Sequence, residues 1–238
     1  GGEGARRRAA AIGNFDGVHL GHRRLLKKTI AFAKRLRAQP AVVVFDPHPR
    51  RYFRPDDPPF LLTTEAKRKA LLEEAGFKDV ITLTFDAGLS AMSQPEFVNS
   101  ILRDNLNLAG VVTGDEFRFG ANRAGDAGAL ARLCADVGID SLQVAPAADG
   151  PNGEKIGSSA IRAAISDGDV GAAAKMLGRL WSVDGVVEEG QRLGRTLGFP
   201  TANFTLGPLI EPRRGVYAVE ATVDGEAYRG VANFGRRP

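Results

Sequence analysis

The sequence predicts an α/β fold in which a doubly wound parallel sheet is followed by part of an all-β barrel. Three observations predict it. The 238 residues suffice for one large domain, or for a full domain plus a smaller one. Short apolar runs alternate with longer amphipathic stretches as far as Gly178, as in β and α units around a parallel sheet. After Leu180 only strand-like segments follow.

In the first part, strands are predicted at the apolar runs 10–13, 41–45, 80–85, 110–113 and 139–145. Helices are predicted between them at residues 20–37, 64–75, 95–107 and 127–137. The strands are continuously apolar rather than alternating, so both faces of the sheet should be covered. The last helical stretch stops at Gly178, a plausible C-cap.

In the second part, strands are predicted at residues 181–188, 215–223 and 226–234, with Asp224-Gly225 as the hairpin turn between the last two. We therefore place a first domain at residues 1–178 and a second at 181–238. An all-β domain must close its edges and needs more strands than these. The second segment is thus interpreted as the front part of a barrel. The chain lacks an initial Met and ends inside a patterned segment, so we expect both ends to be cut.

Composition excludes several classes of protein. Apolar residues make up 43% and charged residues 25%, which is ordinary for a globular chain and unlike disordered or fibrous proteins. The net charge is +4, with arginines and lysines in short runs that suit phosphate sites as well as a nucleic-acid groove. The single Cys134 rules out an internal disulfide and is interpreted as a small buried hydrophobe. No apolar run approaches the ~20 residues of a membrane span and no signal peptide is visible, so a cytoplasmic location is expected.

The first candidate site is the string GNFDGVHLGH, residues 13–22, between the first strand and the first helix. A helix N-terminus at the carboxyl end of such a strand attracts phosphates. Gly17 and Gly21 allow close backbone approach. His19 and His22, three residues apart, can face the same side of the helix and donate hydrogen bonds to an α-phosphate as charge develops. The alternative is a turn with two incidental surface histidines, but two of only three histidines in the chain fall here.

A second candidate is the string GSSAIR, residues 157–162. Ser158, Ser159 and Arg162 at a helix start would clamp phosphate groups, because a guanidinium offers bidentate hydrogen bonds. Taken alone, an ordinary serine N-cap is the better interpretation.

The order of these motifs resembles a known family. GNFDGVHLGH resembles the HxGH signature of the nucleotidyltransferase superfamily, and more closely that of prokaryotic bifunctional riboflavin kinase/FMN adenylyltransferases, or FAD synthetases. FDPHP at 45–49 and GDEFRFG at 114–120 match later elements of that family, with Glu116 where Asp is more usual. GSSAIR resembles its SSTxIR motif, with Gly157 replacing a serine and Ser159 a threonine. The resemblance implies a Rossmann-like doubly wound nucleotidyltransferase domain. The roles of Asp46 and His48 stay open, because prolines on both sides of His48 can simply end the strand.

A third string, residues 190–203, spaces Gly190, Gly194 and Gly198 four apart before a Pro-Thr-Ala-Asn turn. Such glycines can wrap backbone N–H groups around phosphates, and Thr201 and Asn203 offer oxygen ligands to Mg²⁺. A glycine-rich hairpin is the alternative. GRTLGFPTAN, GVYA at 215–218 and GVANFGRRP at 230–238 resemble the opening motifs of the riboflavin kinase barrel.

The resemblance implies the formation of FAD from ATP and FMN, and of FMN from ATP and riboflavin, with Mg²⁺. It assigns catalysis to His19, His22 and Arg162. The other expected positions are Gly13, Phe15, Gly17, Gly21, Ser158 and Ser159 for ATP, Asp115, Phe117 and Asn233 for the flavin pocket, Gly190, Gly194 and Gly198 for the kinase phosphate loop, and Thr201 and Asn203 for the metal. No residue matches the family's catalytic kinase glutamate, and Glu220 and Glu226 have ordinary surface positions. If this is the whole polypeptide, little or no kinase activity is expected.

Two other functions are alternatives to this one. Another HxGH nucleotidyltransferase would act on a different phosphorylated acceptor, such as phosphopantetheine or a pyridine mononucleotide, but it has no reason to carry the β segment with GFPTAN. A basic RNA-binding module would need a concentrated basic face or an aromatic stacking platform, and the motifs include neither. We therefore expect small-molecule substrates, with no nucleic-acid or membrane partner, and the sequence does not predict an oligomeric state.

Overall fold

The structure is a computed structural model that describes residues 7–146, 156–188 and 201–235. The chain divides into two compact units. The first comprises Gly1–Asp57 with Glu65–Ile156, and the second comprises Pro58–Thr64 with Gly157–Pro238. The first unit holds a parallel sheet and the second a small antiparallel one, which confirms the predicted fold class.

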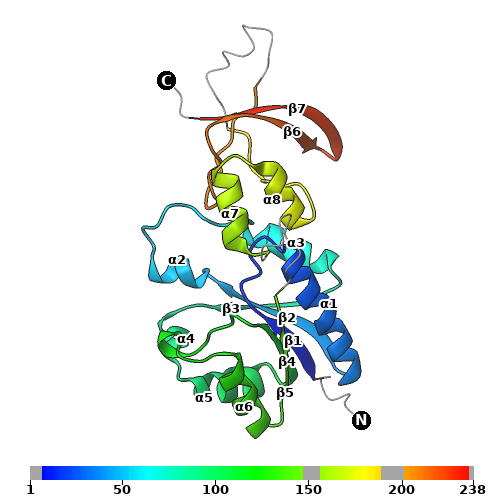
Figure 1. Ribbon diagram of the computed structural model, residues 1–238, viewed down its shortest axis with the longest axis vertical. Helices are drawn as coiled ribbons and strands as arrows, with labels where there is room; N and C mark the ends of the chain where they lie inside the picture. Colours follow the sequence, from blue (N-terminus) through cyan, green and yellow to red (C-terminus); the bar gives the residue numbers. More distant parts are fainter. Residues whose placement is uncertain (1–6, 147–155, 189–200, 236–238) are drawn as a thin grey trace. The chain divides into compact units, whose positions relative to one another are not determined.

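The five strands of the first unit are β1 (Arg8–Ile12), β2 (Gln39–Asp46), β3 (Asp79–Thr84), β4 (Leu108–Gly114) and β5 (Asp140–Val144), all parallel (Figure 1). Their order is β3-β2-β1-β4-β5. The chain builds outward from β1 in one direction through β2 and β3, and then in the other through β4 and β5. The switch point therefore lies between β1 and β4, where doubly wound sheets bind ligands beyond the carboxyl ends of the strands.

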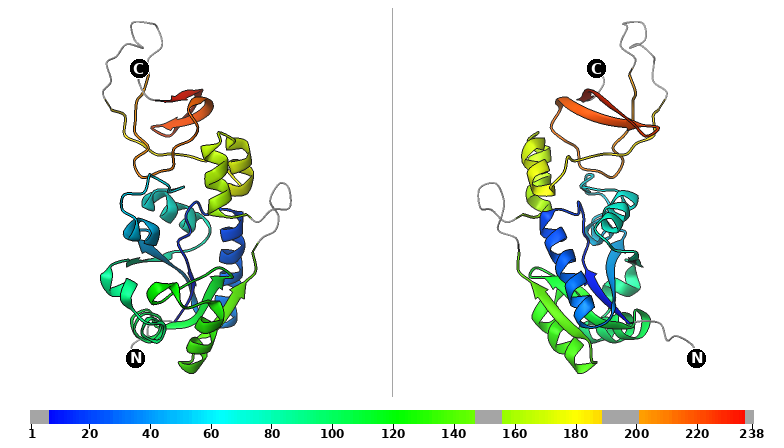
Figure 2. Two further views of the ribbon diagram at one scale, coloured as in Figure 1. Left: turned by 60° about the vertical axis from the view of Figure 1, so that its left-hand side comes forward. Right: turned by 90° about the vertical axis from the view of Figure 1, so that its right-hand side faces the viewer.

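Each face of the sheet has its own hydrophobic core. Ala9, Ala11 and Val42 face α1 (Leu20–Arg35) and α3 (Glu65–Glu74), whereas the alternate residues Ala10 and Ile12 face η1 (Phe97–Asn105) and α6 (Ala127–Asp136). Figures 1 and 2 show α1 and α6 on opposite sides of the sheet. The prediction of a sheet covered on both faces is thus confirmed.

The helices differ from prediction in detail. The helix predicted at 95–107 is a short α5 (Gln94–Glu96), begun by a Ser93–Glu96 capping box, that continues as the π-helix η1. Three short helices were not predicted: α2 (Pro49–Phe53), α4 (Ala87–Ala91) and the 3₁₀ turn η2 (Ala121–Arg123). Each has five residues or fewer, too few to show a helical period in a sequence. Among the described residues, no helix is long and apolar enough to cross a membrane.

The second unit contains α7 (Ser158–Ser166), α8 (Val170–Leu177), β6 (Gly215–Val223) and β7 (Glu226–Phe234). Gly178 ends α8 with φ of 71°, which confirms the predicted C-cap. Asp224 and Gly225 both have positive φ at the hairpin turn, as predicted. The predicted strand at 181–188 is wrong, because residues 181–187 have no regular structure and only Glu188 pairs, in an isolated bridge with Asn203. Apolar alternation does not make a strand where the backbone has no paired neighbour.

Candidate active site

The turn that joins β1 to α1 is buried and tightly wound. Phe15, Gly17 and Val18 all have positive φ, at 49°, 85° and 39°. Side chains with a Cβ seldom adopt this region, so the surrounding structure must hold Phe15 and Val18 there. Both are almost fully buried, and the Val18 N–H donates to the Phe15 carbonyl at 3.1 Å. The sequence predicted this turn, and its buried side chains make it a rigid platform for the histidines that follow.

His19 and His22 lie together at the start of α1. His19 is the N-cap residue, and its Nδ1 accepts a hydrogen bond from the His22 backbone N–H at 3.3 Å. The two rings stack with centroids 3.6 Å apart and an interplanar angle of 20°. Because Nδ1 of His19 is an acceptor, the neutral ring carries its proton on Nε2. His19 is therefore arranged as an Nε2–H donor.

Phe15 and two glycines set the position of this histidine pair. The Phe15 ring lies 5.1 Å from the His22 ring, centroid to centroid. A Cβ on Gly13 would lie 3.3 Å from the Phe15 ring. One on Gly21 would lie 3.1 Å from Nδ1 of His19. The glycines of the motif thus leave room for the packed rings.

Arg68 of α3 is a site residue that sequence analysis missed. It is 6% exposed, and its Nη1 donates to the Asn14 carbonyl at 3.2 Å and its Nη2 to the Phe45 carbonyl at 3.5 Å. Desolvation by burial lowers the pKa of its guanidinium, while the carboxylates of Asp46, Asp16 and Glu65 act in the opposite direction. Arg68 therefore joins the loop that follows β1 to the end of β2. The sequence could have revealed it, because Arg68 stands three positions before Leu71 and four before Leu72. This spacing puts a charged residue on the same buried face of the helix as the two leucines.

The ambiguous His48 is the N-cap of α2, where its Nδ1 accepts from the Arg50 N–H at 3.1 Å. Just beyond it, Tyr52, Phe53 and Phe85 form an edge-to-face cluster with ring centroids 5.2 to 5.7 Å apart. Phe53 is 59% exposed. The sequence analysis did not predict this cluster, because Phe85 directly follows β3 and is distant along the chain.

The loop after β4 carries two predicted flavin-pocket residues. Asp115 is exposed and accepts a hydrogen bond from Nε2 of Gln143 at 2.9 Å. Phe117 stacks on Phe119, with centroids 5.9 Å apart and an interplanar angle of 15°. Since β1 and β4 are neighbours in the sheet, this loop and the histidine turn leave it at the same edge. Glu116, where the family more usually has Asp, is exposed.

The predicted triphosphate residues lie in the second unit, within α7. Gly157 is the N-cap, with extended backbone, and Ser158 and Ser159 open the helix. Arg162 follows one turn later, and its Nε donates to the Phe60 carbonyl at 2.8 Å. All three polar residues thus come from the first five positions of one helix.

Only part of the predicted kinase site can be described. Gly190, Gly194 and Gly198 lie outside the described residues. Thr201 is exposed, and the Asn203 carbonyl accepts from the Glu188 N–H at 2.7 Å. Asn233 is exposed in β7, opposite Val216. The hydroxyl of Thr201 and the side-chain oxygen of Asn203 are hard donors that suit Mg²⁺. Within the described ranges, no group of three or more His, Cys, Asp or Glu residues is arranged to hold a metal.

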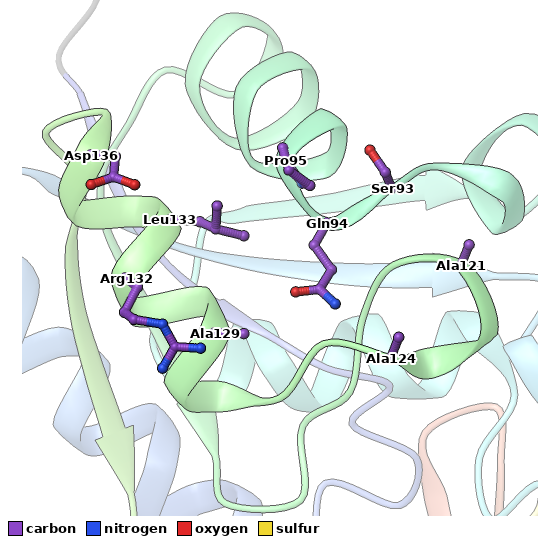
Figure 3. Close-up of a pocket in the computed structure, with 9 residues that line it drawn as sticks. All are labelled: Ser93, Gln94, Pro95, Ala121, Ala124, Ala129, Arg132, Leu133 and Asp136. Atoms are coloured by element: carbon purple, nitrogen blue, oxygen red, sulfur yellow. The ribbon is translucent and has the colours of Figure 1, made fainter.

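A separate hollow of about 560 Å³ opens in the first unit (Figure 3). The Gln94 side chain extends into it from α5, facing residues of α6. Its lining residues are Ser93, Gln94, Pro95, Ala121, Ala124, Ala129, Arg132, Leu133 and Asp136. None of these is a predicted site residue, so the candidate site is defined by the motif residues and not by this hollow.

Comparison with known proteins agrees with the motifs. The FAD synthetase family model matches residues 3–160, and the riboflavin kinase model matches residues 177–238. The bifunctional riboflavin kinase/FMN adenylyltransferase of Escherichia coli strain K12 is 38% identical over 228 residues, which are 95% of this chain and 72% of the relative. The chain belongs to this bifunctional family.

Two further proteins extend the comparison. The bifunctional riboflavin kinase/FMN adenylyltransferase of Pseudomonas fluorescens is 38% identical over 96% of this chain and 73% of its own length. A solved structure described as a macrolide-efflux protein from Streptococcus pneumoniae has a TM-score of 0.85 and 28% identity. That similarity covers 98% of this chain and 75% of the other, so nearly the whole fold is shared. The family thus comprises an FAD synthetase region followed by a riboflavin kinase region, in the order that the motifs predicted.

Proposed function

We propose that this enzyme makes FAD by transferring the adenylyl group of ATP to FMN, and that its second region belongs to the ATP-dependent phosphorylation of riboflavin to FMN. The observation that carries the first activity is the stacked pair His19 and His22 at the N-terminus of α1. It stands beyond the carboxyl end of β1, where the helix dipole favours a phosphate.

In the proposed reaction, an oxygen of the FMN phosphate attacks the α-phosphorus of ATP, a new P–O bond forms, and the bond to pyrophosphate breaks. No covalent enzyme intermediate is needed. His19 and His22 donate hydrogen bonds to the α-phosphate oxygens as charge develops, with Nε2–H of His19 as one donor. Phe15, Gly13, Gly17 and Gly21 keep this pair in place.

The β- and γ-phosphates are assigned to α7. Ser158 and Ser159 provide hydroxyl groups and Arg162 a guanidinium, while the helix N-terminus adds N–H donors. Arg162 stabilises the leaving pyrophosphate electrostatically. Neutral hydroxyls orient the phosphates without adding repulsion.

For the flavin, Phe117 is assigned to contact with the ring system and Asp115 to its polar edge. The Tyr52, Phe53 and Phe85 cluster is a second apolar surface at the same edge of the sheet, and the exposed Phe53 ring is suited to stacking on a planar ligand. In the kinase region, Asn233 is assigned to the riboflavin pocket and Gly190, Gly194 and Gly198 to the phosphate loop. Thr201 and Asn203 would hold Mg²⁺, which when bound neutralises phosphate charge.

The proposed domain limits are 1–178 for adenylyl transfer and 181–238 for the kinase region. Gly178 as the end of α8 supports this limit. We also propose a cytoplasmic location, since both proposed reactions consume ATP.

The test is direct. The protein is incubated with ATP, Mg²⁺ and either FMN or riboflavin, and the flavins are separated by chromatography. We expect FAD from FMN, and a panel with phosphopantetheine and nicotinamide mononucleotide should give no product. Adenylylation of one of those acceptors in place of FMN would refute the substrate assignment.

The role of the histidines is tested by His22→Ala. We expect turnover to fall by about 100-fold or more, as for other groups that stabilise transition-state charge, with unchanged thermal unfolding. Lys27→Ala, an exposed change on the same helix, is the control. Unchanged FAD formation in His22→Ala would contradict the assignment.

A further inference from the structure

Residues 60–62, which we call the strap, belong to the second unit but to none of the sequence motifs described above. Three consecutive backbone carbonyls of the strap each accept a hydrogen bond from a different element. Phe60 O accepts from Nε of Arg162 at 2.8 Å, Leu61 O from the backbone N–H of Ile210 at 2.8 Å, and Leu62 O from Nε1 of Trp181 at 3.0 Å. The strap thus connects α7 to the chain on both sides of the kinase phosphate loop.

The first of these contacts determines how Arg162 is oriented. Besides the Nε bond to the Phe60 carbonyl, the guanidinium carbon of Arg162 lies 5.4 Å from the centroid of the Phe60 ring. A planar guanidinium whose Nε edge and one face are both engaged has little freedom left to rotate. Phe60 is only 4% exposed, so the platform under the arginine is itself firmly packed.

The other contacts hold the strap. Leu61 pairs in parallel with Leu209, and its N–H donates to the Pro208 carbonyl at 3.2 Å. Leu62 and Leu209 are almost fully buried, at 0% and 2% exposure. The indole N–H of Trp181 holds the strap at Leu62 through its hydrogen bond to the Leu62 carbonyl. Breaking one of these partly buried bonds removes a hydrogen bond that holds the strap, and the strap backbone can then shift.

The partners of the strap come from different sequence regions. The strap and Arg162 belong to the first domain as the sequence delimits it, whereas Trp181 and Leu209 lie within the region matched by the riboflavin kinase model. All of them belong to one compact unit. The orientation of Arg162 therefore depends on residues of the kinase region.

We propose that Phe60 and Trp181 are positioning residues for adenylyl transfer, which hold Arg162 against the polyphosphate of ATP through the strap. This inference rests on the proposed role of Arg162 and deepens it. It makes ATP use by the adenylyltransferase region dependent on the packing of the first residues of the kinase region. Neither residue needs to touch a substrate.

The experiment compares Trp181→Phe and Phe60→Leu with the unchanged protein, each alone and combined with Arg162→Ala. Trp181→Phe keeps an aromatic side chain but removes the N–H donor together with the five-membered ring that carries it. Trp181→Phe loses a hydrogen bond to the strap, and Phe60→Leu loses the aromatic ring that lies against the Arg162 guanidinium. We expect each single change to raise the KM for ATP and the dissociation constant of Mg-ATP by about fivefold. The KM for FMN should stay constant. In the Arg162→Ala background, neither change should weaken ATP binding further.

Tyr217→Phe is the matched control, because it removes an aromatic donor to a backbone carbonyl of the same unit, that of Arg213, which is not part of the strap. It should leave the KM for ATP unchanged. Equal losses in the presence and absence of Arg162, or an unchanged KM for ATP in both folded variants, would overturn the proposal. If Trp181→Phe does not fold, Phe60→Leu decides the question, since its backbone carbonyl remains.

The measurement separates this proposal from the proposed function. Calorimetric titration with Mg-ATP requires no FMN and no turnover. Absence of FAD formation by the unchanged protein would count against adenylyl transfer to FMN, whereas the coupling between the strap and Arg162 would still be read from ATP affinity. Loss of coupling with normal FAD formation would count against the strap alone.

Discussion

Gly21 offers a sharp test of how the histidine pair is held. It occupies the second position of α1, and its counterpart Gly128 occupies the second position of α6. A Cβ on Gly21 would lie 3.1 Å from Nδ1 and from Cε1 of His19 and 3.3 Å from the Ile156 carbonyl oxygen. A Cβ on Gly128 would meet its nearest neighbour, the cap carboxylate of Asp126, only at 3.4 Å. The same substitution is therefore crowded in one helix and accommodated in the other.

The magnitudes follow from these distances. Replacing glycine by alanine inside a helix gains up to about 1 kcal/mol from backbone entropy. In Gly128→Ala nothing opposes that gain. In Gly21→Ala the Ile156 carbonyl belongs to the backbone and resists movement. The His19 ring must therefore shift by roughly a few tenths of an ångström from its stack on His22. Since a misplacement of about 1 Å can cost about 100-fold in rate, we expect FAD formation to fall by about tenfold.

The assay is steady-state FAD formation together with thermal unfolding of both variants. Gly21→Ala should lose turnover while its midpoint of unfolding changes little, and Gly128→Ala should keep turnover with an equal or higher midpoint. The reasoning is refuted if Gly21→Ala keeps its full turnover, or if Gly128→Ala loses as much.

Further predictions concern buried groups and a helix end. Arg68→Met removes the cation that joins the loop after β1 to the end of β2 and should destabilise the fold by about 3 kcal/mol. The exposed neighbour Lys69→Ala should change stability by less than about 0.5 kcal/mol in chemical denaturation. Burial raises the pKa of the Cys134 thiol from 9.0 to about 12. The folded protein thus keeps a proton that the unfolded chain releases, and stability present below pH 9 should fall above it by up to about 1.4 kcal/mol per pH unit. Denaturation at several alkaline pH values should show this slope, and Cys134→Ala should lack it. Gly178, the C-cap of α8, has a φ of 71°, so Gly178→Ala should lower the free energy of unfolding by about 1 kcal/mol. Gly171→Ala, inside α8, should not lower it.

Local patterns accounted for much of this protein. The strands and most long helices were predictable because apolar spacing reflects burial on one or two faces. The histidine turn was predictable because its glycines and histidines are contiguous in the chain. The C-cap at Gly178 and the turn at Asp224-Gly225 depend on single residues with special backbone freedom, and both were predicted.

The remaining features depend on residues far apart in the sequence. The π-helical geometry of η1 and the unpaired segment at 181–187 depend on what packs against each backbone, which no local spacing records. Arg68 meets Asn14 from a distance of 54 residues, and Phe60 meets Arg162 from a distance of 102.

By itself, the sequence determined the fold class, the family and the identity of the motif residues, because each depends on residues close together in the chain. Only the tertiary structure decided the burial of Arg68 between the loop after β1 and the end of β2, and the strap under Arg162. Those depend on distances between segments. Such distances are set by packing of the whole core, in which each contact is favourable only when all the others are present.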